Sequence, residues 1–174
     1  PQRKTDNENR QANEIFEPAN LLKGHSLLSG GWIVNNGFQT DDGCTGGPCL
    51  NFKMSKDGNA KQGGFANGAA LKESMPVSQG KTYALSFWAM GAGEVWLHAW
   101  CYDSANNYIG DLKQPQDGSH FKVKSDQWQQ FGLAPILFPD KTASMKICFE
   151  LPQSAASAVD VKLDNVSFGE MSKR

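Results

Sequence analysis

Apolar and polar residues alternate most regularly between Tyr83 and Tyr102, in the sequence YALSFWAMGAGEVWLHAWCY. Before the Gly-Ala-Gly segment at residues 91–93, large apolar side chains at every second position predict a strand with one buried face. The same alternation resumes at Val95. A short glycine-rich segment between two such runs is typical of a hairpin turn. We therefore predict two neighbouring strands joined by a turn at residues 91–93.

The second of these runs is unusual because both of its faces are nonpolar or aromatic. One face is formed by small or aliphatic residues and a cysteine: Val95, Leu97, Ala99 and Cys101. The other face is formed by aromatic residues: Trp96, His98, Trp100 and Tyr102. If the first face packs in the core, the aromatic residues need a cover, which is either a second protein layer or a ligand. If the aromatic face packs in the core, its residues have a structural role. The pattern leaves both possibilities open.

Short strand-like runs separated by glycine-rich turns recur along the rest of the chain. They are residues 49–54, 70–77, 121–123, 128–131, 145–151 and 159–168, with a turn expected at residues 124–126. No segment has helical periodicity, and short strands at this spacing are typical of an antiparallel β-sandwich of the jelly-roll type. We predict an all-β fold with residues 15–170 as one domain. Residues 1–14 are expected to be a flexible polar leader or linker, and residues 171–174 a tail.

The charge balance and the hydropathy of the chain exclude two classes of partner. The formal net charge is -1, which does not indicate the basic surface of a nucleic-acid-binding protein. No apolar run approaches the roughly 18 residues of a membrane span. We therefore expect neither a nucleic acid nor a membrane as partner.

The chain has four cysteines, without the spacing of a zinc site. Cys44 and Cys49 bracket a Gly-Gly-Pro turn, while Cys101 and Cys148 lie in predicted strands. Two disulfides, Cys44–Cys49 and Cys101–Cys148, would place the domain outside the cytosol. Four reduced, buried thiols are the alternative. We predict that both pairs are oxidised and that the protein is secreted, although strand alternation does not settle whether Cys101 and Cys148 share a face.

Four segments follow one another in the order known from a family of binding modules. They are Asn20–Gly24 with Gly31-Trp32, Gly80–Ala89, Trp128–Phe131 and Leu163–Phe168. Together they resemble jelly-roll carbohydrate-binding modules of the group around families 4, 9 and 22, over residues 15–170. The cysteine pairs and the long segment 103–120 depart from the pattern of this group.

This resemblance implies a non-catalytic module that binds a polysaccharide chain along an aromatic-lined sheet and targets an attached enzyme to it. Sugar rings stack their C–H faces on aromatic rings, and their hydroxyl groups bond to polar neighbours. The candidate carbohydrate-binding residues are Trp88, Trp96, His98, Trp100 and Tyr102, with Trp88 and Trp96 expected as cross-strand neighbours. The expected partners are a polysaccharide, whose identity the sequence does not give, and an appended catalytic domain.

The resemblance also implies a structural calcium ion. Modules of this group commonly hold Ca²⁺ between the opening segment and the final strand, using carboxylate and carbonyl oxygens. Asp164 matches the aspartate of the final strand, and Glu17 is the best match to the opening glutamate.

Two other function classes compete with this interpretation. A retaining glycosidase needs two carboxylates about 5–5.5 Å apart, but no Glu-x-Asp-x-Glu pattern is present. No Gly-x-Ser-x-Gly motif occurs, and arginine is confined to positions 3, 10 and 174. We therefore predict that the domain is not an enzyme. An extracellular protein-binding or adhesion domain of similar shape is the main alternative, and glycan binding distinguishes the two.

Overall fold

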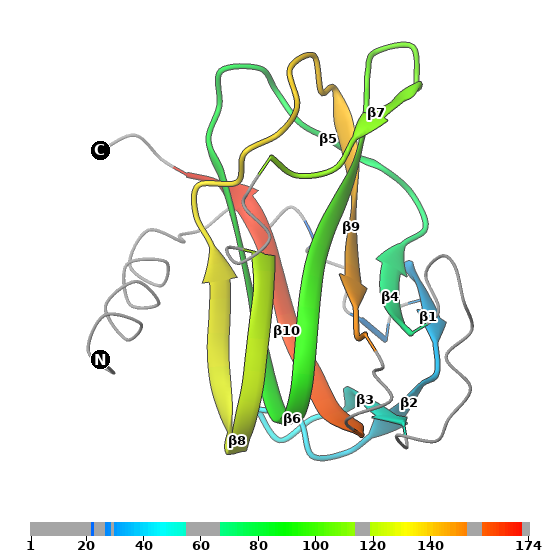
Figure 1. The fold of residues 1–174 in the computed structure, drawn as a ribbon, viewed down its shortest axis with the longest axis vertical. Coiled ribbons are helices and arrows are strands. Elements are labelled where there is room, and N and C mark those ends of the chain that lie inside the picture. Colours follow the sequence, from blue (N-terminus) through cyan, green and yellow to red (C-terminus); the bar gives the residue numbers. More distant parts are fainter. Residues whose placement is uncertain are drawn as a thin grey trace.

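The computed structural model describes residues 22, 27–28, 30–54, 67–113, 119–152 and 158–171, and Figure 1 shows them as a β-sandwich. Ten antiparallel strands form in this part of the chain. In chain order they are β1 (Trp32–Asn35), β2 (Gly37–Thr40), β3 (Cys49–Met54), β4 (Gly68–Leu71), β5 (Met75–Pro76), β6 (Tyr83–Tyr102), β7 (Tyr108–Gly110), β8 (His120–Leu133), β9 (Ser144–Glu150) and β10 (Val159–Glu170). The predicted all-β fold, an antiparallel sandwich of the jelly-roll type, is confirmed. No helix among these residues has the length and apolar character that crossing a bilayer requires.

The strands form two layers that share β6. One layer, called the β9 layer, has the order β1-β4-β9-β6, and the other, called the β10 layer, has the order β6-β10-β3-β2. The second half of β6 pairs with β9 from Trp96 to Tyr102, whereas its first half pairs with β10 from Tyr83 to Ala92. Strand β8 lies alongside both halves of β6 (Figure 1). The long strand β6 therefore belongs to both layers.

Gly91 lies where β6 passes from one layer to the other. The predicted hairpin at residues 91–93 is wrong, because β6 is one continuous strand from Tyr83 to Tyr102 whose halves pair with different partners. At Gly91 the φ angle is +113°, and a Cβ atom would lie 1.9 Å from the carbonyl oxygen of Asp160 on β10. Glycine is needed here because β10 approaches the strand closely, and not because the chain reverses.

The core lies between the two layers, and the odd-numbered residues of β6 fill much of it. Phe87, from the first half, contacts Phe149 of β9 with ring centroids 5.1 Å apart. Leu85 and Leu97, from the two halves, are both buried, and burying such a side chain contributes about 1.5–3 kcal/mol. Because the odd-numbered side chains of both halves point inward, the even-numbered ones point outward on opposite sides of the sandwich.

All four cysteines are free thiols. The predicted disulfides, Cys44–Cys49 and Cys101–Cys148, are therefore wrong. Cys101 lies on the buried side of β6, whereas Cys148 is aligned with His98, which faces outward. The two side chains thus leave the sheet in opposite directions, which the geometry of a disulfide does not allow. Burial raises the pKa of Cys101 to about 11 and that of Cys44 to about 12, so both thiols are protonated at neutral pH.

Candidate functional site

The outward side of the second half of β6 is lined by aromatic residues. The even-numbered residues Trp96, His98, Trp100 and Tyr102 are partly exposed, and the odd-numbered residues between them are buried. This settles which face of the strand is the core. The four residues, together with Lys146 and Glu150 on the neighbouring strand β9, are called the aromatic face. Lys146 is aligned with Trp100, and Glu150 is aligned with Trp96.

Trp96 is held in place by β8 and by its own strand. Its ring stacks on His120, with ring centroids 4.2 Å apart and an angle of 5° between the planes. Its Nε1 donates a hydrogen bond of 2.9 Å to Oε2 of Glu94. The sequence analysis did not assign His120 to the site. Its contribution depends on the register of β8 with β6, which places it opposite Trp96.

His98 lies at the centre of the aromatic face between two carboxylates. Its Nδ1 is 2.6 Å from Oδ2 of Asp111, and its Nε2 is 3.1 Å from Oε2 of Glu150. Ionised carboxylates only accept hydrogen bonds, so both ring nitrogens must carry a proton to satisfy both contacts. His98 is therefore an imidazolium in this arrangement. The hydrogen bond with Asp111 raises the pKa of His98, and burial opposes that rise only in part.

Asp111 contacts both the ring of His98 and the backbone of the sheet. Its Oδ1 accepts hydrogen bonds from the backbone N–H of Ala99 at 2.8 Å and of Leu112 at 2.7 Å. Burial on its own would raise the pKa of Asp111, but the hydrogen bonds from His98 and from the backbone outweigh it and lower the pKa. No motif in the segment 103–120 distinguishes Asp111, so the sequence analysis did not find it.

The other end of the aromatic face is formed by tyrosines. Tyr102 contacts Tyr108 of β7 edge to face, with ring centroids 6.0 Å apart, and Tyr108 is 60% exposed. Lys146 Nζ donates a hydrogen bond of 2.6 Å to the backbone carbonyl of Lys72. The aromatic face therefore combines broad apolar rings with both positive and negative polar groups.

Trp88 does not belong to the aromatic face. It lies in the first half of β6, where it is aligned with Asp164 of β10 and Gln130 of β8. The expectation that Trp88 and Trp96 are cross-strand neighbours is wrong, because both belong to one strand and point outward from different layers. Trp88 is partly exposed on the opposite side of the sandwich.

The predicted calcium ligands can be placed only in part. Glu17 lies outside the described residues. The carboxylate of Asp164 accepts hydrogen bonds from the backbone N–H of Cys44 at 2.9 Å and of Asn165 at 2.8 Å, which stabilises the turn after β2. Among the described residues, no group of three or more acidic, histidine or cysteine side chains forms a cluster suited to a metal. Asp164 therefore has a turn-stabilising role here, and calcium binding stays a prediction.

Comparisons with known proteins found similarity in structure but not in sequence. The chain matches no model of a known protein family, and no curated protein matches it. A xylan-binding family 22 module of Paenibacillus barcinonensis Xyn10C superposes with a TM-score of 0.54 at 13% identity, over 83% of this chain and 88% of that one. The family 22 and family 10 modules of the Clostridium thermocellum xylanase 10B, solved with xylohexaose, give a TM-score of 0.55 at 14% identity, over 82% of this chain and 26% of that one.

A third solved structure is an enzyme. The enzymatically active domain of tailspike protein 4 from bacteriophage CBA120 gives a TM-score of 0.57 at 11% identity, over 82% of this chain but only 20% of that one. Identities this low establish a shared fold alone. The chain therefore has the β-sandwich fold of these carbohydrate-binding modules, as its sequence resemblance to their group predicted.

Proposed function

We propose that this domain is a non-catalytic module that binds a polysaccharide chain on its aromatic face. The observation that carries the proposal is the outward exposure of Trp96 and Trp100 on a strand whose other side is fully packed in the core. Both rings keep part of their surface exposed on the outward side of the strand, and that surface is available to a ligand. Four residues of strand separate them by roughly 13 Å, a distance that an extended glycan chain can bridge.

The polar groups of the aromatic face suit the recognition of sugar hydroxyls. His98 lies between the two tryptophans and is fixed by Asp111 and Glu150. Lys146 adds a hydrogen-bond donor beside Trp100. Stacking on the rings supplies affinity, and these charged groups select the orientation and the configuration of the sugar.

The same geometry supports binding rather than catalysis. A glycosidase needs a carboxylic acid whose pKa is raised, so that it can donate a proton to the leaving group. The pKa of Asp111 is lowered instead. The carboxylate of Glu150 is engaged with the ring of His98. We therefore assign both carboxylates to positioning His98.

The proposal also concerns which polysaccharide is bound and whether an enzyme is attached to the domain. Xylan is the first ligand to test, because two structurally similar modules are described as xylan-binding or were solved with xylohexaose. One of them is joined to a family 10 module, which supports an appended catalytic domain for this chain also. An extracellular location is proposed on the same basis, without the predicted disulfides as support.

Calorimetry with Trp96→Ala, Trp100→Ala and Trp88→Ala tests the proposal. Xylohexaose, cellohexaose and mannohexaose serve as probes, and the melting temperature of each variant is measured in parallel. Losing an aromatic anchor costs about 2 kcal/mol or more, which is about thirtyfold in affinity. We expect this loss for Trp96→Ala and Trp100→Ala. Trp88→Ala is the matched control, because it removes a tryptophan from the same strand on the opposite side and should keep the affinity.

Two outcomes would contradict the proposal. If folded wild-type protein binds no glycan in a broad panel, a protein-binding or adhesion role replaces it. If Trp88→Ala loses as much affinity as Trp100→Ala while both remain folded, the ligand does not bind on the aromatic face.

A further inference from the structure

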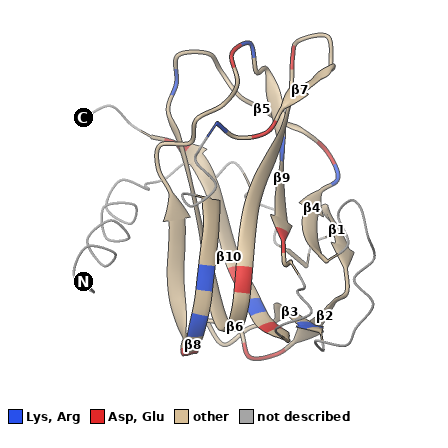
Figure 2. Cartoon of the chain, in the orientation of Figure 1, with Lys and Arg blue, Asp and Glu red and all other residues tan. Residues whose placement is uncertain are grey.

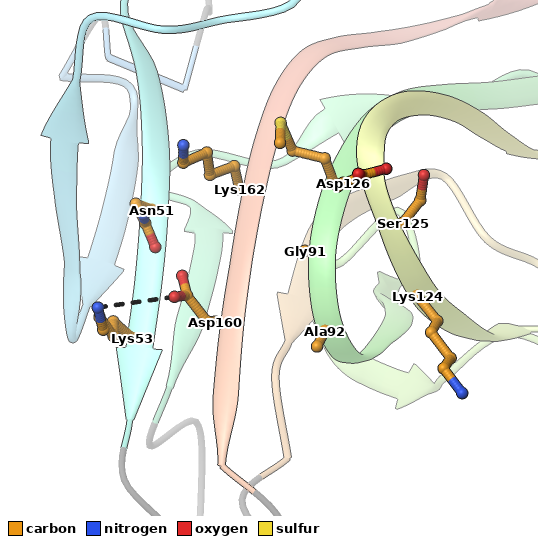
Figure 3. A pocket seen from close by; sticks show the side chains of 10 residues that line it. Asn51, Lys53, Gly91, Ala92, Lys124, Ser125, Asp126, Asp160 and Lys162 are labelled. Carbon is orange, nitrogen blue, oxygen red and sulfur yellow. Dashed lines mark ion pairs between the residues drawn. The ribbon is translucent and has the colours of Figure 1, made fainter.

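A cleft lies on the β10 layer, on the side of the sandwich away from the aromatic face. Its volume is about 710 Å³, and residues of β3, β6, β8 and β10 line it (Figure 3). This volume falls within the roughly 300–1,000 Å³ of small-molecule sites in proteins. The cleft lies where β6 passes from one layer to the other, and Met90, Gly91 and Ala92 form part of its wall. It is therefore large enough for a ligand and shares no lining residue with the aromatic face.

One residue that lines this cleft has a hydrogen-bond acceptor without a partner. Asn51 of β3 is only 7% exposed, and its side-chain Oδ1 has no hydrogen-bond partner. No other buried side-chain nitrogen or oxygen among the described residues lacks one. Figure 3 shows this oxygen directed into the cleft, toward Asp160. A buried acceptor without a partner costs about 1–3 kcal/mol, so its presence in a strand between Leu50 and Phe52 calls for a donor from outside the protein.

The charges around Asn51 balance. Lysines and aspartates alternate along the lining, and Figure 2 shows basic and acidic residues interspersed on β6, β8 and β10 at this end of the sandwich. Lys53 pairs with Asp160 at 3.7 Å, and Lys162 pairs with Asp42 outside the cleft. The lining carries three lysines and two aspartates, and Asp42 adds a third aspartate through its pair with Lys162, so the cleft does not select for a strongly charged ligand.

The ion pair between Lys53 and Asp160, beside Asn51, can be displaced at low cost. The side chains of Lys53 and Asp160 are 68% and 51% exposed, and exposed pairs of this kind contribute about 0–1 kcal/mol. Asn51 Oδ1 is itself shielded from solvent, so a ligand reaches it only when neighbouring side chains move. Once displaced, the ammonium and carboxylate groups become a donor and an acceptor for hydroxyl groups, while Met90 offers an apolar contact.

We propose that this cleft is a second binding site, for an uncharged polyhydroxylated ligand of the short-oligosaccharide class. A ligand hydroxyl donates its hydrogen bond to Asn51 Oδ1, and further hydroxyls bond to Lys53 and Asp160. The choice of an oligosaccharide rests on the proposed function, whereas the site itself rests on the cleft and its unsatisfied acceptor. With a site on each side, one domain binds two glycan segments and gains avidity on a dense polysaccharide.

The substitution Asn51→Leu separates a binding role of this residue from a structural one. Leucine has a similar shape and removes the unpartnered oxygen, so the melting temperature should stay the same or rise. Calorimetry with xylohexaose, cellohexaose and mannohexaose then counts sites in four proteins: wild type, Asn51→Leu, Trp100→Ala and the double variant. We expect two sites in wild type, one in each single variant and none in the double variant. Asn51→Leu should lower affinity at the second site at least tenfold.

Each outcome decides between the two sites. Loss of all binding to every probe in Trp100→Ala overturns the second site and leaves the aromatic face intact as the binding site. A single wild-type site that Asn51→Leu removes and Trp100→Ala does not overturns the aromatic face instead. A drop of several degrees in the melting temperature of Asn51→Leu shows that Asn51 has a structural partner, and this also overturns the second site.

Discussion

His98 should make the stability of the fold depend on pH. Its ring contacts Asp111 at 2.6 Å and Glu150 at 3.1 Å, and both contacts need the protonated ring. Because its pKa in the folded state is raised above the reference value of 6.5, the protonated form stabilises the fold. That contribution is complete below a pH of about 6.5 and is lost as the pH rises through the folded-state pKa.

The substitution His98→Gln removes the charge and keeps a polar side chain of moderate size. A hydrogen bond to a charged group contributes about 1.5–3 kcal/mol, and the backbone N–H groups of Ala99 and Leu112 still bond to Asp111 after the change. We therefore expect a loss of about 2 kcal/mol in the free energy of unfolding at acidic pH. For a domain of this size, that corresponds to about 4–8 °C in melting temperature.

Scanning calorimetry of wild type and His98→Gln between pH 5 and pH 9, in about half-unit steps, measures this difference. The gap in melting temperature should be largest at the acidic end and should shrink as wild-type His98 loses its proton. A double-mutant cycle with Asp111→Asn measures the coupling between the two residues directly. A gap that stays constant over the whole range would refute the assignment of His98 as an imidazolium.

Two further predictions concern Gly91, where β6 changes layers, and the final strand. Gly91→Ala should destabilise the fold by more than about 3 kcal/mol in urea unfolding, because its φ angle is +113° and the new Cβ would lie 1.9 Å from a backbone oxygen. Gly47→Ala, which meets no atom within 4 Å, is its control and should change stability by less than about 0.5 kcal/mol. If Asp164 binds calcium, the melting temperature should rise with calcium concentration in wild type but not in Asp164→Asn. Identical wild-type melting curves in calcium and in chelator would discard the calcium site.

Strand alternation predicted the faces of β6 as two alternatives, and the structure selected one. Alternation is a local property, because successive side chains of a strand point to opposite sides whatever the strand pairs with. The two faces at Leu97 and His98 could therefore be read from the sequence. Which face is buried depends on the second layer, which is built from residues far away in the chain.

The errors concern features that depend on distant partners. A Gly-Ala-Gly segment in a hairpin and one in a strand that changes layers have the same local sequence, and only pairing with β9 and β10 distinguishes them. The wrong expectation that Trp88 and Trp96 are cross-strand neighbours follows from that error. The predicted bridge from Cys101 to Cys148 fails for a related reason, because the register decides which side each sulfur faces. Asp111 and Asn51 carry no motif, and only tertiary contacts reveal them.

The position of β6 in the chain has a consequence for folding. Its pairing partners β7, β8, β9 and β10 all follow it in the sequence, and the pairing of Tyr83 with Glu170 joins residues that are half the length of the chain apart. Contacts between residues so distant in sequence give a high contact order, which slows folding because loops must close before the contacts form. While residues 159–170 are absent from a growing chain, the long apolar strand β6 keeps an open edge, where strands of other chains can pair.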